Sequence, residues 1–206
     1  MPVNDYTRVY LAEVRSLADR LDADAIDRMV ELLVDLRDRG GRLFFLGVGG
    51  GAGNAGHAVN DFRKIAAIES WAPTDNVSEL TARINDDGWD SCYAAWLRGS
   101  RLTPRDAVFV FSVGGGSVER RISMNIVSAL AFARQVGASI LGVVGRDGGC
   151  TARLADACVI VPIASPETVT PHTEEFQAVV WHLIVSHPRL QANAMKWESG
   201  ERESAP

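Results

Sequence analysis

Hydrophobic positions along the chain follow two kinds of pattern. Near the N-terminus, two stretches carry apolar residues at helical spacing, over 6–20 and again from Ile26 to Leu36. A weaker apolar stretch at 69–72 indicates a short strand. Four other continuous apolar runs lead into glycine or proline, as buried parallel strands do, and they cover 43–46, 107–111, 139–144 and 158–161.

Helical patterns separate these strands, and the longest of them cover about 118–136 and 172–186. Strands that alternate with helices predict a doubly wound parallel sheet, because parallel strands need crossover connections. We therefore expect one α/β domain over residues 1–190, with two extra helices before the first strand. The polar segment 191–206 is predicted to be a disordered tail.

Composition and charge limit the possible binding partners and the cellular compartment. The 206 residues are 47% hydrophobic and 23% charged, with a formal net charge of -5. This charge argues against non-specific binding to nucleic acid or to an anionic membrane. The three cysteines form no CxxC pair, and no apolar run is long enough for a signal core or a membrane span. We therefore expect a cytoplasmic protein.

Two glycine-rich turns follow the carboxyl ends of predicted strands. In an open parallel sheet, ligands bind at these ends. Glycine lets the backbone approach an anion, and a helix N-terminus behind each turn offers free N–H groups. Ser112 and Ser117 add hydroxyl donors, and Ser117 is also a candidate N-cap. The alternative is that these are ordinary tight turns. We favour a phosphate cradle whose glycines are Gly49, Gly50, Gly51, Gly114 and Gly115.

Nucleotide-binding motifs fit this pattern less well. The sequence contains no GxxxxGK[ST], which argues against a P-loop. The segment GVGGGAG at 47–53 is only a loose match to GxGxxG, and no clean acidic ribose ligand follows it at the expected distance.

Two pairs of polar residues are candidates for chemistry. His57 and Asp61 are four apart on a predicted helix, and Glu174 and His182 are eight apart on the last one, so each pair shares a helix face. Together they could bind a divalent metal such as zinc, or supply an acid and a base. Alternatively, the first pair is a surface hydrogen bond and His182, within AVVWHLIV, is a core histidine. Only the fold can bring the two helices together.

An ordered set of motifs resembles the sedoheptulose-7-phosphate isomerases (phosphoheptose isomerases) of the sugar-isomerase (SIS) superfamily. GVGGG at 47–51 takes the place of a GNGGS-like turn, and His57 and Asp61 follow at the matching offsets. SVGGGS at 112–117 aligns with a serine-rich phosphate loop, and VVGRDGG at 143–149 with an LTGKDGG-like turn. Glu174 and His182 stand where the family has glutamine and histidine.

The resemblance implies a three-layer α/β/α sandwich with a five-stranded parallel sheet, flavodoxin-like in order. It also implies a homotetramer with shared active sites, so that His182 would serve a neighbouring chain, and a divalent metal, usually zinc. The implied reaction converts sedoheptulose 7-phosphate to a heptose 7-phosphate through an enediol. Asp61 would be the base and His182 its partner acid/base. Ser112, Ser117 and backbone N–H groups would hold the phosphate. The metal would be held by His57, Asp61, Glu174 and His182. The sugar would be contacted by Asn85, Asp86 and also Glu174.

Several positions depart from the family pattern. Val48, Gly51, Val113 and Gly114 stand where the family carries polar side chains, so backbone N–H groups must compensate for missing donors. Asp61 is one methylene shorter than the family glutamate, which predicts a carboxylate withdrawn by about 1 Å, and a displacement of that size costs about 10²-fold in rate. Glu174 adds a negative charge, which favours a cation beside it.

Two rival functions differ in class from the isomerase. One is a non-catalytic SIS assembly protein that binds a protein partner, such as a bacterial replication initiator. The other is a sugar-phosphate-sensing domain, which lacks support because no DNA-binding domain is attached. Retention of histidine at 57 and 182 and of an acid at 61 favours the enzyme.

Overall fold

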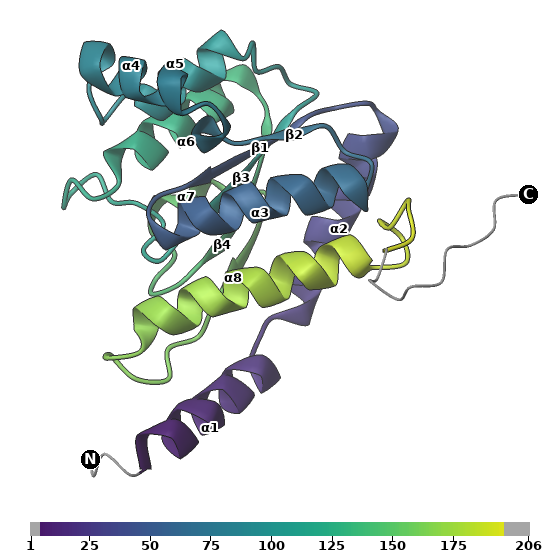
Figure 1. Ribbon diagram of the computed structural model, residues 1–206, viewed down its shortest axis with the longest axis vertical. Helices are drawn as coiled ribbons and strands as arrows, with labels where there is room; N and C mark the ends of the chain where they lie inside the picture. The colour runs from purple at the N-terminus through teal and green to yellow at the C-terminus, as the bar shows by residue number, and fades with distance from the viewer. Residues whose placement is uncertain (1–4, 196–206) are drawn as a thin grey trace, which may run out of the picture.

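The computed structural model describes residues 5–195, which form a five-stranded parallel sheet between two helical layers (Figure 1). The strand order is β2-β1-β3-β4-β5, and every neighbouring pair is parallel. This arrangement confirms the predicted α/β/α sandwich and its flavodoxin-like order. The strands are β1 (Leu43–Gly47), β2 (Ser70–Trp71), β3 (Ala107–Ser112), β4 (Ser139–Val144) and β5 (Ala157–Ile160).

Helices connect the strands, and two of them precede β1 as predicted. No helix within residues 5–195 is long and apolar enough to cross a bilayer. One short 3-10 turn, η2, covers Pro73–Asp75. The α-helices are α1 (Tyr6–Asp19), α2 (Ala23–Asp38), α3 (Gly50–Lys64), α4 (Val77–Asp87), α5 (Cys92–Gly99), α6 (Met124–Val136), α7 (Gly149–Leu154) and α8 (Val169–Ser186).

The two faces of the sheet carry separate apolar cores, because successive side chains of a strand point to opposite faces. One core joins Phe45, Phe109 and Phe111 to α2, α3 and α8. The other joins Phe44 and Val110 to α5, α6 and α7. Burial on both faces explains the continuous apolar runs of the strands. It also places α3 and α8 side by side on one face (Figure 1).

The two glycine-rich turns meet at the carboxyl edge of the sheet. β1 pairs with β3 in full register from Leu43–Ala107 to Gly47–Phe111, although β2 lies between them in sequence. Strand order therefore reverses between β1 and β3, and crevices for ligands form at such switch points. The turns that follow these two strands are adjacent for this reason.

The segment between β3 and α6 differs from the prediction. A helix was expected from about 118, with Ser117 as its N-cap, but α6 begins only at Met124. Residues 117–123 instead form a turn, closed by an antiparallel bridge between Ser117 and Ile122. Arg121 and Ser123 adopt left-handed backbone angles, with φ of 50° and 49°, which end any helix there. The Ser117 hydroxyl accepts from the Arg120 N–H, within the turn.

A polar cluster fastens α1 to α8. His172 is buried, and its Nε2 and Nδ1 lie 2.9 Å and 3.0 Å from the carboxylates of Glu13 and Glu175. The Tyr10 hydroxyl also donates to Glu175. Because α1 projects from the body of the molecule (Figure 1), these bonds add to the attachment that Leu17 provides in the core.

We expect His172→Ala to lower the free energy of unfolding by about 2 kcal/mol, because it removes two charge-assisted hydrogen bonds. Urea unfolding at pH 7 measures this change. The matched control is Glu31→Gln, which removes an exposed pair with Arg189 and is expected to cost less than about 0.5 kcal/mol. Equal effects of the two substitutions would contradict the assigned role of His172.

The same cluster predicts a pH dependence. The hydrogen bond from His172 holds the pKa of Glu13 below its ordinary 4.5. The stabilisation by this carboxylate is therefore fully present above pH 4.5, and it is lost as the pH falls through the lower folded pKa. We expect the stability difference between the wild type and Glu13→Gln to shrink as the pH is lowered through that range.

The predicted polar tail over 191–206 falls mainly outside the described residues. Within its first part, the N–H groups of Ala192 and Asn193 both donate to the Ile65 carbonyl at 2.9 Å. The Asn193 side chain donates to the carbonyl of Lys64. The chain up to this point is therefore hydrogen-bonded to the end of α3.

Candidate functional site

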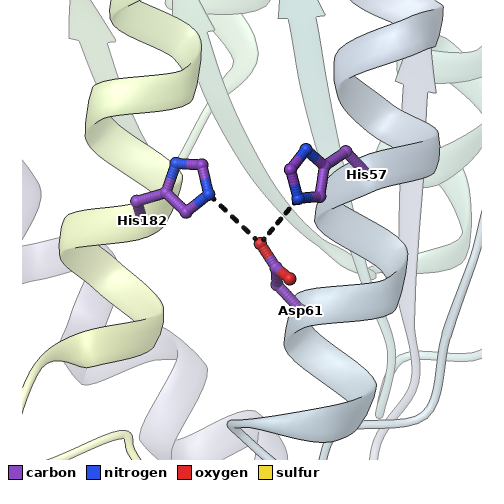
Figure 2. A group of neighbouring side chains, drawn as sticks. All are labelled: His57, Asp61 and His182. Atoms are coloured by element: carbon purple, nitrogen blue, oxygen red, sulfur yellow. Dashed lines mark ion pairs between the residues drawn. The ribbon is translucent and has the colours of Figure 1, made fainter. Parts of the chain in front are cut away.

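Three side chains from α3 and α8 converge on the outer side of these helices (Figure 2). Asp61 Oδ2 lies 3.5 Å from His57 Nε2 and 3.4 Å from His182 Nε2. The three candidate ligand atoms all lie within 4.8 Å of one another. The carboxylate is mostly buried, whereas both imidazoles are about half exposed, at 56% and 51% of their side-chain surface. We call His57, Asp61 and His182 the triad.

Hydrogen bonds from neighbouring groups orient the side chains of the triad. The indole N–H of Trp181 donates to Asp61 Oδ2 at 3.1 Å, and the Asn60 amide donates to Oδ1 at 3.1 Å. His182 Nδ1 lies 2.8 Å from the Ala178 carbonyl, so this nitrogen carries the proton and donates it. The lone pair of His182 Nε2 then faces Asp61.

This donor set suits a cation. A carboxylate oxygen and imidazole Nε2 atoms that converge as acceptors repel one another unless a proton or a metal ion lies between them. Two histidines and one carboxylate, each held by an outer hydrogen bond or by packing, also match the ligand types of catalytic zinc sites, which keep a further position open. The residues of the triad therefore fit a divalent metal.

Asp61 reaches the imidazoles in spite of its short side chain. We expected its carboxylate to be withdrawn relative to a glutamate at this position. In the structure α3 and α8 run side by side, and Trp181 and His182 approach Asp61 from α8. The close approach of the two helices brings the His182 imidazole to the shorter acid, whereas His57 reaches it from one turn earlier on α3.

Glu174 was predicted as a fourth ligand, but it does not join the triad among the described residues. It lies eight residues before His182, about 12 Å along α8. Its carboxylate lies against the Cα of Gly50, where an added Cβ would meet it at 2.3 Å. The side chain of Asn54 donates to the Glu174 carbonyl and to Gln177, which fixes this part of α8 against α3. Glu174 therefore lines the neighbouring cleft.

That cleft, with a volume of about 650 Å³, opens where the two glycine-rich turns meet. Of the predicted phosphate-binding residues, Gly51, Ser112, Gly114 and Ser117 line it directly, together with Glu174. Gly49 and Gly50 begin α3 beside it. Gly115 is buried under the turn, where its carbonyl accepts from the N–H and hydroxyl of Thr151.

Asn85 and Asp86 are not brought to this place. Both are exposed on α4, and the Asn85 amide donates to Asp86. Neither lines the cleft or joins the triad. Helix α4 covers the opposite side of the sheet from α8, which explains the separation (Figure 1). The predicted contact of these two residues with the sugar is therefore not formed within one chain.

Sequence reasoning missed several lining residues. Ser123, Arg120, Arg146 and Arg153 all border the cleft. Arginine side chains are ordinarily solvated, so neither the context of Arg120 and Arg153 nor the VVGRDGG motif around Arg146 singled out their side chains. Ser123 stands directly before the apolar pattern of α6, which was the available indication that this helix starts there.

Known proteins resemble the chain over most of its length. A phosphoheptose isomerase from Syntrophotalea carbinolica is 32% identical over 185 residues, covering 86% of this chain and 89% of the relative. The chain belongs to the phosphoheptose isomerase family. Another relative, the lincomycin biosynthesis protein LmbN of Streptomyces lincolnensis, is 31% identical over 187 residues, covering 87% of this chain and 68% of that protein. No family model matches the chain.

Solved structures of phosphoheptose isomerases share the fold. The protein from Neisseria gonorrhoeae superposes with a TM-score of 0.75 at 22% identity, over 89% of this chain and 97% of that one. The protein from Francisella tularensis gives a TM-score of 0.73 at 19% identity, over 89% and 94%. Membership of the phosphoheptose isomerase family makes this chain one of the sugar-phosphate isomerases with a SIS fold.

Proposed function

We propose that the protein is an aldose–ketose isomerase that converts sedoheptulose 7-phosphate to a heptose 7-phosphate through an enediol. The observation that carries this proposal is the placement of the triad and the cleft on the same two helices. Both α3 and α8 begin at the cleft, and both present triad residues further along. One bound molecule can therefore contact both with its two ends.

The spacing favours a long sugar phosphate. Gly50 and His57 are seven residues apart, which is about 10 Å along α3. An extended chain advances about 1.2 Å per bond, so a phosphorus atom lies about 8 Å from C2 in a heptulose 7-phosphate and about 4 Å in a triose phosphate. A seven-carbon substrate with its phosphate in the cleft brings C1 and C2 toward the triad.

Isomerisation moves one proton between neighbouring carbons and one between their oxygens. We assign Asp61 Oδ2 as the base that removes a proton from C1 of the ketose and returns it to C2 of the enediol. While its Nε2 is not bound to a metal ion, His182 transfers the proton between the two oxygens through that nitrogen. Its Nδ1 bond to the Ala178 carbonyl holds the ring in the orientation this requires.

The triad would also hold a divalent metal, with zinc the expected ion. When bound, such an ion polarises the carbonyl and stabilises the negative charge of the enediolate. His57 and His182 are half exposed, so the substrate can approach from the outer side of the helices. Glu174, beside Gly50, lines the cleft and is placed to accept hydrogen bonds from sugar hydroxyls.

The direct test is turnover. Purified protein with a divalent metal is expected to convert sedoheptulose 7-phosphate, and NMR would follow the aldehyde carbon of the product in its hydrated or cyclic form. Ketose phosphates of five to eight carbons serve as comparisons. Absence of turnover with all of them would refute the proposed activity.

Metal content provides an independent prediction. We expect His57→Ala and His182→Ala to lose at least about ten-fold in affinity for zinc, because each removes one of three ligands. The matched control is His187→Ala, which removes a partly buried histidine directly after α8 and is expected to leave metal binding unchanged. Elemental analysis after dialysis against limiting zinc measures the effect. Equal zinc content in all three variants would place the metal elsewhere.

We also propose a homotetramer, on the basis of the family resemblance. The triad forms within one chain, so its assembly does not require His182 of another subunit.

A further inference from the structure

The cleft contains more positive charge than its glycine loops suggest. Three arginines from separate segments line it: Arg120 from the turn after β3, Arg146 from the turn after β4, and Arg153 from α7. Three acids, Glu119, Asp147 and Glu174, line it as well. Without the arginines the lining would be strongly negative and would repel a phosphate.

Two of these arginines have no polar partner in the part of the chain that the structure describes. Across residues 5–195, the guanidinium groups of Arg120 and Arg146 make neither a hydrogen bond nor an ion pair with a side chain or carbonyl. Their neighbours differ, since Arg121 pairs with Asp90 at 2.7 Å and Arg153 contacts the Cys150 sulfur at 3.1 Å. Arg120 and Arg146 are therefore available to a ligand in the cleft.

The backbone of Arg146 supports this role. Its φ is 55°, in the left-handed region where a residue other than glycine costs about 1–2 kcal/mol. This conformation directs the side chain across Gly114, so that its Cδ lies 3.8 Å from the place of an added Cβ on that glycine. Backbone strain of this kind is concentrated at active sites and ligand-binding sites.

Some of the uncharged hydrogen-bond donors around the cleft are already bonded within the protein. The Ser117 hydroxyl donates to the Glu119 carboxylate at 3.0 Å. The N–H groups of Cys150 and Thr151, at the start of α7, donate to the carbonyls of Gly116 and Gly115. These amides would otherwise be the natural donors to an anion at this point. Fewer neutral donors therefore remain for a phosphate than the loop sequence suggests.

We propose that Arg120 and Arg146 bind the phosphate of the substrate, in place of the hydroxyl donors that Val113 and Gly114 lack. Guanidinium groups form paired, charge-assisted bonds with phosphate oxygens, and two of them compensate the charge of a phosphate dianion. This inference rests on the proposed function for the identity of the sugar, but the anion site itself does not depend on turnover.

The sharpest variant is Arg146→Gly. Because glycine tolerates a left-handed φ, this substitution relieves strain and should leave the protein as stable as the wild type or more stable. A loss of binding could then not be attributed to misfolding. Arg101→Gly is the matched control, since Arg101 has a φ of 54° and does not line the cleft. Arg120→Ala tests the second arginine and keeps its backbone N–H bond to Ser117.

Binding of inorganic phosphate, measured by calorimetry on the full chain, is the primary readout. We expect Arg146→Gly and Arg120→Ala each to weaken it about ten-fold or more, and Arg101→Gly to leave it unchanged. With sedoheptulose 7-phosphate, KM should rise by a similar factor in the first two variants while kcat changes less.

The outcomes separate the two proposals. Phosphate binding that depends on Arg120 and Arg146 without any turnover supports the anion site and refutes the isomerase. Turnover with an unchanged phosphate affinity in Arg146→Gly and Arg120→Ala refutes the arginine site and leaves the isomerase standing. A wild-type protein that binds no phosphate also overturns this inference.

Discussion

Asp61→Asn is expected to lower kcat for isomerisation by about 10²- to 10⁴-fold, the usual contribution of a general base. Asparagine has nearly the same shape, and its carbonyl oxygen can still accept from Trp181, so the fold should be retained. Its amide cannot take a proton from C1, and it is a poorer metal ligand than a carboxylate. The initial rate with sedoheptulose 7-phosphate, measured by NMR at saturating zinc, gives the effect.

Two comparisons make this result specific. Asp35→Asn changes an exposed carboxylate on α2 in the same way and is expected to leave kcat unchanged. Zinc content of the Asp61→Asn protein separates loss of the base from loss of the metal. A kcat within ten-fold of wild type in a metal-loaded Asp61→Asn protein would assign the base to another group. A protein that acts only by binding a partner would show no turnover even as wild type.

The layered fold was predictable because it follows from local patterns. The strand predicted over 139–144 matches β4 in both bounds, and the other strands begin or end within about two residues of their predicted limits. The inner strands β1, β3 and β4 are buried on both faces, so their sequences are almost wholly apolar. The edge strand β2 is short and contains Ser70 and an exposed Trp71, which explains its weaker signal. Crossover helices with one apolar face then fix the parallel order.

The start of α6 shows where local patterns fail. Glu119, Arg120 and Arg121 resemble the solvated face of a helix, and Ile122 continues the apolar spacing. What decides the structure is the bridge from Ser117 to Ile122 and the left-handed backbone at Arg121 and Ser123, and helical periodicity carries no information on either.

The sequence could name most of the side chains of the candidate site, but not how they group in space. Spacing alone paired His57 with Asp61 and Glu174 with His182, on helices more than 100 residues apart. The packing of α3 against α8 joins His182 to the first pair and leaves Glu174 at the cleft. Trp181 was predicted only as part of an apolar run, since its indole bond to Asp61 depends on that same packing.

The turns that form the cleft are themselves locked together by backbone contacts. Gly115 has a φ of 66°, and a Cβ there would lie 1.9 Å from the Gly148 carbonyl oxygen. The left-handed φ and the clash both involve the main chain, which cannot move aside as a flexible side chain would. Across the same interface, Gly115 accepts two bonds from Thr151. Even one methyl group must therefore separate the turn after β3 from the turn after β4.

We expect Gly115→Ala to lower the free energy of unfolding by about 3 kcal/mol or more, since the left-handed backbone alone costs about 1–2 kcal/mol and the clash adds to it. Urea unfolding measures the loss, and phosphate binding should weaken with it because the cleft is deformed. Gly56→Ala is the control: it lies within α3 with no atom near its added Cβ, so it should stabilise by up to about 1 kcal/mol. Equal stability of the two variants would show that the turns are not interlocked. The phosphate-binding role of the cleft would then lose its structural basis, because the rigid placement of Arg146 over Gly114 depends on the contact between these turns.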